Sequence, residues 1–226
     1  MRILIVVATG MEVAPVVAKL LLASEKGPRL NAYAYLAHNV DVLTTGVGMV
    51  ATSAWCSHAI GHSYYDLALN FGVCGSFDPE CRPGDVVYVR SDRIAELGAE
   101  DDEAFLTAQE LGLVGEDEFP STCGQLLNLE PPDNPIIRRL RAVDGITVNT
   151  AHGRDRSIAA VRARFNPHVE SMEGAAFAYA CLIHRLPHAQ VRAVSNMVEK
   201  RNLDAWKLDD AIVNLGQTAL SILDHA

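Results

Sequence analysis

Apolar residues recur along the chain in two alternating patterns. Short, almost continuous runs rich in Val, Ile and Leu have the character of strands buried on both faces of a sheet. These runs are "RILIVVA" (2–8), "VDVLTT" (40–45), "DLALNFGV" (66–73), "DVVYVRSD" (85–92), "GITVNTA" (145–151) and "AQVRAVS" (189–195). Segments with helical spacing lie between or after them, at 11–23, 49–60, 134–143, 154–165, 173–186 and 204–223. This alternation predicts one α/β domain over residues 1–226, because no repeat, low-complexity tract or linker divides the chain.

Residues 95–130 do not follow this alternation. The segment is acidic, carries several glycines and has only weak periodicity, as "AELGAEDDEAF" at its start illustrates. We therefore predict that it is an insertion with a surface loop.

The composition narrows the classes of partner. Of the 226 residues, 49% are apolar and 21% are charged, which is ordinary for a globular protein with a sizeable core. The net charge of −9 and the lack of a basic stripe argue against nucleic acid as a partner. No apolar stretch approaches the roughly 20 residues that a membrane helix needs, so we expect no membrane-spanning segment.

The number and spacing of the cysteines indicate the redox state of the compartment in which the protein works. Their odd number and the lack of a C-x-x-C pair fit neither a disulfide framework nor a zinc site, and they indicate a reducing environment. The N-terminal run "RILIVVAT" is too short for a signal peptide and lacks a cleavage pattern. We therefore predict a cytoplasmic protein.

A glycine pattern after the second predicted strand resembles a phosphate loop. "TGVGMVA" (45–51) matches G-x-G-x-x-A between a strand and a helix. A dinucleotide site would also need an acidic residue at the end of the next strand, but Asp66 stands at the start of that strand. We interpret the pattern as a tight turn whose backbone lines a pocket.

Three polar residues follow predicted strands. Glu12 comes just after the first strand, Glu173 opens an alanine-rich helix, and Asn196 closes the last strand. Taken singly, the carboxylates fit first-turn helix electrostatics and the asparagine fits a turn or a helix cap. In open parallel sheets, however, ligands bind at the carboxyl ends of the strands, so their joint placement favours a common site.

The motifs around these residues resemble the nucleoside phosphorylase and hydrolase superfamily, in its methylthioadenosine/adenosylhomocysteine nucleosidase branch. The matching segments are "ILIVVATGMEV", "TTGVGMVATS", "LNFGVCGSFDPECRPGDVV", "VESMEGAAFAY" and "VRAVSNMVEKRN". Within that branch, "DRIAELGAED" and "SNMVEKRNLDAW" are similar to the futalosine hydrolases of the alternative menaquinone pathway. The resemblance implies a three-layer α/β/α sandwich around a mixed, partly closed sheet, usually as a homodimer. It also implies that no metal or organic cofactor is needed.

The resemblance assigns roles in cleaving an N-glycosidic bond. It implies that Glu173 binds the ribose hydroxyls, that Met172 packs against ribose and base, and that Glu12 deprotonates the attacking water. Such groups stabilise the cationic sugar and the departing base of the transition state. The loop "VATGMEVAP" contains no cation to hold phosphate, which favours water as the nucleophile.

Asn196 bears on the base that is released. The adenosine-type nucleosidases resemble one another in having aspartate at this position. An amide offers two N–H donors, which suit O6 and N7 of hypoxanthine better than a carboxyl group does. The substitution therefore predicts selection for a 6-oxopurine nucleoside, with futalosine as the substrate and hypoxanthine as a product.

The remaining pocket residues follow from the same alignment. Val47, Cys74 and Gly75 are expected to line the base or ribose site through their backbone, and Ser195 to contact the substrate. Nothing in the sequence marks Cys74 as an activated nucleophile, so a small buried residue is the favoured interpretation. The carboxylate at the far end of futalosine calls for a cation. Arg93, Lys200 and Arg201 are candidates, although each also fits a solvated surface charge.

Four alternatives remain open. The chain fits a methylthioadenosine/adenosylhomocysteine nucleosidase, which Asn196 opposes, or a purine nucleoside phosphorylase, whose activity would depend on phosphate. It also fits a non-catalytic purine-binding or dinucleotide-binding module. The presence of both Glu12 and Glu173 favours an enzyme.

Overall fold

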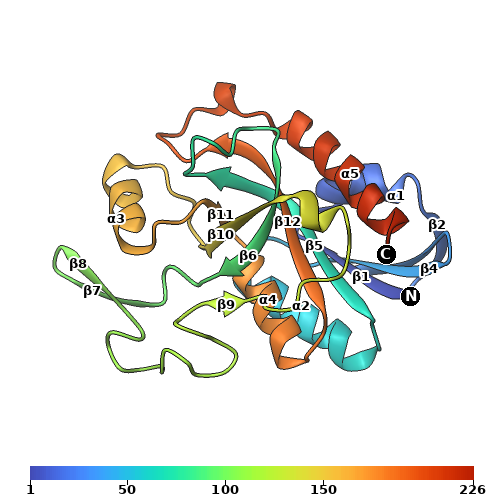
Figure 1. Ribbon diagram of the computed structural model, residues 1–226, viewed down its shortest axis with the longest axis horizontal. Helices are drawn as coiled ribbons and strands as arrows, with labels where there is room; N and C mark the ends of the chain where they lie inside the picture. The colour runs from blue at the N-terminus through green and yellow to red at the C-terminus, as the bar shows by residue number, and fades with distance from the viewer.

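The computed structural model describes residues 1–226 and is built on one large mixed sheet (Figure 1). Its strands are β1 (Arg2–Val7), β2 (Leu21–Glu25), β3 (Leu30–Tyr35), β4 (His38–Thr44), β5 (Leu67–Ser76), β6 (Val86–Asp92), β9 (Leu126–Leu127), β10 (Arg141–Thr147), β11 (Val169–Ser171) and β12 (His188–Met197). The order is β11-β10-β6-β12-β5-β1-β4-β3-β2, with β9 paired to β6. Because β11 also pairs with β5, the strands β5, β12, β6, β10 and β11 close into a ring, and the others extend from it. The expected mixed, partly closed sheet is confirmed.

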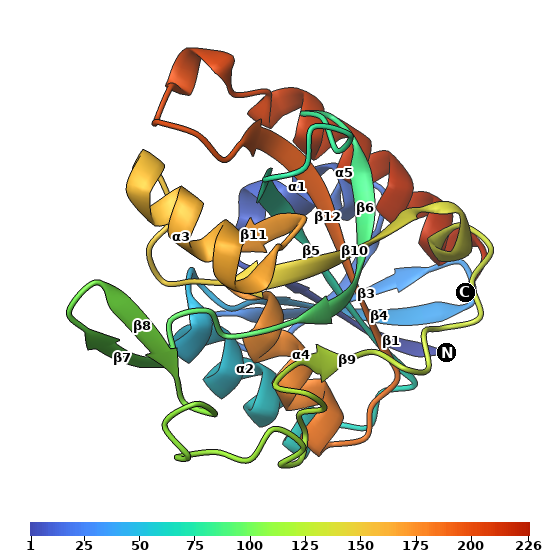
Figure 2. The ribbon, with the colours of Figure 1, turned by 60° about the vertical axis from the view of Figure 1, so that its left-hand side comes forward.

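Helices cover both faces of this sheet. They are α1 (Gly10–Val17), α2 (Met49–His62), α3 (Asp155–Phe165), α4 (Gly174–Ile183) and α5 (Leu208–Asp224). The pair α1 and α5 packs on one face and the pair α2 and α4 on the other, while α3 lies beside the ends of β10 and β11 (Figures 1 and 2). The expected three-layer sandwich is confirmed.

The continuous apolar runs reflect burial on both faces. In β1, Ile3 and Ile5 face the core under α1 and α5, whereas Leu4 and Val6 face the core under α2 and α4. A strand between two helical layers has no solvated face, so the alternation of polar and apolar residues disappears. The strands β4, β1, β5 and β12 run parallel, and their carboxyl ends therefore meet at one edge of the sheet.

Two predicted helices are wrong in part. The helix predicted at 11–23 ends at Val17, and Leu21–Glu25 form an exposed edge strand instead. The segment 134–143 contains only a 3-10 turn at Ile137–Arg139, and β10 starts at Arg141. In both places pairing with a neighbouring strand outweighs a local helical spacing.

The predicted insertion is partly ordered into strands. A hairpin of β7 (Gly98–Asp101) and β8 (Ala104–Thr107) stands apart from the main sheet, and a largely irregular segment leads from it to β9 (Figure 2). No helix of the structure combines the length and the apolar character that crossing a bilayer requires.

Candidate active site

A cavity of about 830 Å³ opens at the carboxyl ends of the parallel strands. It is walled by the loops that follow β1, β4 and β10 and by the ends of β5, β11 and β12. All eight site residues predicted from the sequence line it: Glu12, Val47, Cys74, Gly75, Met172, Glu173, Ser195 and Asn196. The structure thus brings together side chains that lie up to 184 positions apart, from Glu12 to Asn196.

Glu12 stands in the first turn of α1 and reaches the floor of the cavity. Its Oε2 accepts a hydrogen bond from the backbone N–H of Thr9 at 2.8 Å, and its Oε1 accepts one from the N–H of Val73 at 3.3 Å. The side chain is buried, and burial raises the pKa of Glu12 above that of an ordinary glutamate. A fixed carboxylate with a raised pKa has the properties of a general base.

Glu173 immediately precedes α4 and is held from across the cavity. Its Oε1 accepts a hydrogen bond of 3.0 Å from the backbone N–H of Gly48. Gly48 has a φ of 96°, a conformation that favours glycine. The glycine turn after β4 is therefore a tight turn that lines the cavity and orients the carboxylate of Glu173. The backbone N–H of Gly48 is engaged by this carboxylate and is not free to bind a phosphate.

Arg192 lies beneath both carboxylates and was not predicted as a site residue. Its Nη1 is 3.9 Å from Oε2 of Glu173, and its Nε donates to Oε1 of Gln190 at 3.1 Å. A Cβ atom on Gly72 would overlap this guanidinium and would lie 3.0 Å from Oε1 of Glu12. The arginine therefore passes close to the chain of β5 and compensates the charge of the buried pair. An arginine in the middle of an apolar strand is the sequence signal for it, since unpaired charges are rarely buried.

A buried carboxylate continues this network away from the cavity. Asp92 accepts hydrogen bonds from Nε2 of Gln190 at 2.9 Å and from Oγ1 of Thr147 at 2.8 Å. Burial raises the pKa of Asp92 to about 7, although the hydrogen bond from Thr147 and the charge of Arg192 act in the opposite direction. Asp92, Gln190 and Arg192 thus form one chain of polar contacts that ends under the active carboxylates.

Asn196 is oriented by its neighbour in β12. Oγ of Ser195 donates to Oδ1 of Asn196 at 2.8 Å and also lies 3.2 Å from the carbonyl oxygen of Cys74. Nδ2 of Asn196 donates to the carbonyl oxygen of Met197 at 2.9 Å, which leaves one N–H of the amide for a ligand. Burial raises the pKa of the Cys74 thiol to about 12, so this cysteine is not a nucleophile at neutral pH.

A histidine and a second glutamate also line the cavity and were missed. Nδ1 of His152 lies 2.6 Å from Oε2 of Glu170, and Glu170 is buried in β11. His152 belongs to the coil after β10, where the sequence gives no periodicity to mark it. The only hint is the acidic residue that precedes "SMEG" within the resemblance.

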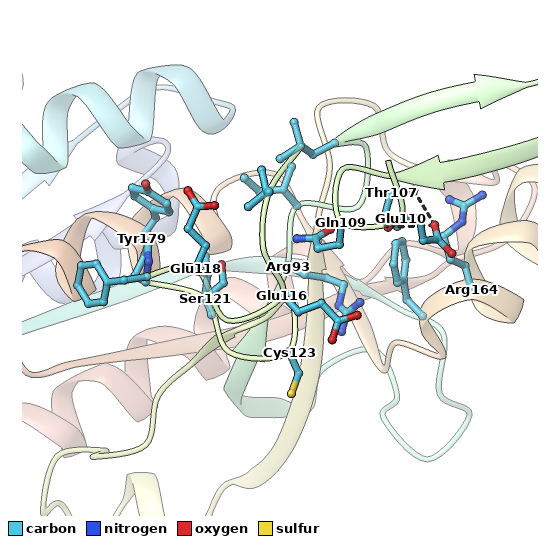
Figure 3. Close-up of a pocket in the computed structure, with 18 residues that line it drawn as sticks. Arg93, Thr107, Gln109, Glu110, Glu116, Glu118, Ser121, Cys123, Arg164 and Tyr179 are labelled. Atoms are coloured by element: carbon cyan, nitrogen blue, oxygen red, sulfur yellow. Dashed lines mark hydrogen bonds between the residues drawn. The ribbon is translucent and has the colours of Figure 1, made fainter. Parts of the chain in front are cut away.

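The proposed cations are not gathered at this cavity. Of the three, only Arg201 lines it, with its guanidinium carbon 5.6 Å from the ring centre of Trp206. Arg93 lines a separate cavity of about 400 Å³ between the insertion, α3 and α4, where it lies over the ring of Phe165 (Figure 3). Lys200 is exposed and outside both cavities. The structure has no group of three His, Cys, Asp or Glu side chains that could hold a metal ion.

Comparison with known proteins places this geometry in a family. The sequence model of the phosphorylase superfamily matches residues 2–226 of this chain. A futalosine hydrolase of Streptomyces coelicolor is 30% identical over 187 residues, which cover 77% of this chain and 74% of that protein. The futalosine hydrolase of Acidothermus cellulolyticus is 28% identical over 224 residues, covering 94% and 86%.

A solved structure supports the same fold. The 5′-methylthioadenosine/S-adenosylhomocysteine nucleosidase of Colwellia psychrerythraea, in complex with adenine, superposes with a TM-score of 0.80. The superposition covers 100% of this chain and 95% of that one, at 23% sequence identity. The resemblance predicted from the sequence is confirmed, and the chain belongs to the phosphorylase superfamily.

Proposed function

We propose that the protein hydrolyses the N-glycosidic bond of futalosine and releases hypoxanthine. The observation that carries this proposal is the convergence of Glu12, Glu173 and Asn196 on one cavity at the carboxyl ends of the strands. These three side chains supply a base, an acceptor for ribose hydroxyls and an amide donor for a purine. The two curated relatives described above, which are named futalosine hydrolases, support the same substrate.

The carboxylates of Glu173 and Glu12 have different roles in the reaction. Glu173, with one oxygen tied to Gly48, offers its other oxygen to the ribose hydroxyls and faces the positive charge that develops on the sugar. Glu12 deprotonates the water that attacks C1′, for which its raised pKa is suited. The positive charge of Arg192 lies beside Glu173 and partly opposes the rise in the pKa of Glu12.

Water is favoured over phosphate as the nucleophile. A phosphorylase needs cations at the nucleophile site, and the chain between β1 and α1 carries none. Arg192 is fully buried and is already engaged by Gln190 and Glu173. A dependence of cleavage on added phosphate would contradict this proposal.

A methylthioadenosine/adenosylhomocysteine nucleosidase is the second candidate. It is favoured by the structural similarity to the Colwellia enzyme, whose structure contains adenine. Adenine presents an amino donor where hypoxanthine presents O6, so the two bases need different partners. Ser195 engages the amide oxygen of Asn196 and leaves an N–H group for the base, which suits the acceptors of hypoxanthine.

The test is an assay of the purified protein with futalosine in a buffer free of phosphate. We expect one hypoxanthine to be released for each futalosine consumed. Glu173→Gln should lower kcat more than it raises KM, because the ribose that Glu173 contacts develops positive charge only in the transition state. A parallel assay with methylthioadenosine measures adenine. Preferential release of adenine would favour the second candidate, and no release from either nucleoside would favour a binding module.

We propose further that the protein acts in the cytoplasm as a homodimer. All five cysteines are free, which fits a reducing compartment. Apolar side chains are exposed on the outer face of α2 and α4 and on the adjacent insertion, a surface that would be covered in a dimer. These side chains are Val50, Leu113, Phe119, Tyr179 and Ile183.

A further inference from the structure

One pair of cavity residues has no part in the chemistry described so far: His152 and Glu170. Nδ1 of His152 lies 2.6 Å from Oε2 of Glu170, and the backbone N–H of His152 donates to Oε1 at 3.0 Å. Both carboxylate oxygens therefore hold the same residue. Because a carboxylate only accepts hydrogen bonds, Nδ1 carries a hydrogen and Nε2 is the nitrogen left for a ligand.

The strand register places this pair next to Asn196. Gly75 in β5 is paired with Glu170 in β11 on one side and with Asn196 in β12 on the other. A Cβ atom on Gly75 would lie 3.5 Å from Cγ of Glu170 and 3.4 Å from Nδ2 of Asn196. Cγ2 of Val198 would lie nearer still, at 2.8 Å, so there is no room for a side chain at Gly75 and the two polar groups lie on either side of it. The proposed function puts the purine at this end of the cavity.

That end of the cavity needs a proton donor. When the bond between C1′ and N9 breaks, its electron pair passes to the purine, which leaves more readily if it takes up a proton. The amide of Asn196 donates a hydrogen bond but cannot give up its proton. An imidazole can do so near neutral pH, and the Glu170 carboxylate is placed to balance the charge of its protonated form. The ring of Phe77 also lies beside the imidazole, with 6.3 Å between the two ring centres.

We propose that His152 is the general acid that protonates the departing purine and that Glu170 positions it; this inference rests on the proposed nucleosidase function. The proton on Nε2 passes to the purine as the electron pair of the C1′–N9 bond moves onto the base. Water adds to C1′ and loses its proton to Glu12. The neutral imidazole then regains a proton from solvent and Glu12 releases its proton to solvent, which completes the cycle.

The test compares two leaving groups. Futalosine releases a purine that needs a proton, whereas a 4-nitrophenyl riboside with the same 5′ group releases a stable anion that needs none. His152→Gln should lower kcat on futalosine by about 10²-fold or more and leave cleavage of the nitrophenyl riboside close to that of the wild type. Equal losses on both substrates would show a structural role and overturn the proposal, as would an unchanged rate on futalosine.

Glu170→Gln tests the positioning role in the same assay. It should lower the rate on futalosine in the same selective way, and the double variant should be no slower than His152→Gln, because the two residues act as one unit. Additive losses would contradict this. His225→Gln is the control, since it removes an exposed histidine far from the cavity.

The outcomes separate this inference from the proposed function. A wild-type protein that releases no hypoxanthine from futalosine would refute the substrate proposed above. If adenine is released from methylthioadenosine instead, the His152 comparison is made with that nucleoside and the matching nitrophenyl riboside. An active wild type with an equally active His152→Gln variant would refute the general acid alone.

Discussion

Nη1 of Arg192 lies 3.9 Å from Oε2 of Glu173, and both side chains are buried. Arg192→Gln leaves the two carboxylates of the cavity without a compensating charge and leaves Gln190 without its donor. Removing one partner of a buried ion pair typically destabilises a fold by about 3–5 kcal/mol. We therefore expect a loss of this size in the free energy of unfolding, measured in urea, together with a large fall in kcat.

An arginine elsewhere provides the control for this prediction. Arg138 pairs with Asp133 on the surface, where both side chains are mostly exposed. Arg138→Gln should change the free energy of unfolding by less than about 1 kcal/mol. If Arg192→Gln is as stable and as active as this control, the charge of Arg192 does not support the site.

The central strands of the sheet could be predicted from the sequence because they are buried on both faces. The edge strand β2 could not. The run "KLLLA" continues the helical spacing of α1, but Leu21 and Leu22 belong to the exposed edge strand β2. Their strand conformation depends on pairing with β3, which lies later in the chain. A local pattern contains no information about such a partner.

The same distinction applies to the site. Glu12, Glu173 and Asn196 could be placed from the rule that ligands bind at the carboxyl ends of strands. Arg192 and Glu170 owe their positions to contacts across strands, the first against Gly72 and the second beside Gly75. Such contacts follow from register, which becomes visible only in the folded sheet.

Glu12→Gln should make the protein slower and more stable. Burial raises the pKa of Glu12, so folding favours its protonated form. That contribution to stability is complete below the ordinary glutamate pKa and is lost as the pH rises through the raised value. The glutamine variant cannot ionise and should unfold at a higher temperature than the wild type at neutral pH. Loss of the base should lower kcat by about 10²–10⁴-fold.

Thermal unfolding across pH separates these two effects. The stability gain of Glu12→Gln should shrink as the pH falls from the raised pKa of Glu12 towards the ordinary glutamate pKa, because the folded wild type is then protonated as well, and it should be absent below that ordinary value. A gain that does not vary with pH would show that ionisation of Glu12 does not limit stability. A wild-type rate in the variant would refute its role as the base.

The buried Asp92 should make the protein less stable as the pH rises towards 7. Burial raises the pKa of Asp92 to about 7, so its contribution is complete below the ordinary aspartate pKa and is lost as the pH rises through 7. The free energy of unfolding of the wild type should therefore decline more steeply between about pH 4 and 7 than that of Asp92→Asn, and the two should run parallel above that range. Urea unfolding of both proteins across this range measures the difference. Parallel curves would mean that Asp92 stays ionised in the folded protein.

The proposed dimer predicts a mass twice the 24.5 kDa of the chain in light scattering. Ile183→Glu puts a charge on the outer face of α4, where the side chain is 41% exposed, and should shift the protein to a monomer. Val213→Glu on α5 introduces the same charge at a residue that is 50% exposed and should leave the dimer intact. A monomeric wild type at micromolar concentration would refute the dimer, and a dimeric Ile183→Glu variant would exclude this face.

Asn196→Asp should move selectivity from hypoxanthine towards adenine. In the wild type, Ser195 binds the amide oxygen of Asn196 and leaves its N–H for O6 or N7 of the base. A carboxylate in the same place has no donor for these acceptors, and an unpaired buried polar group costs about 1–3 kcal/mol. The ratio of kcat/KM for futalosine to that for its 6-amino analogue should therefore fall by about one to two powers of ten. Both substrates are measured at the same pH with both proteins. A wild type that prefers the 6-amino analogue, or an exchange that leaves the ratio unchanged, would mean that Asn196 does not read the base.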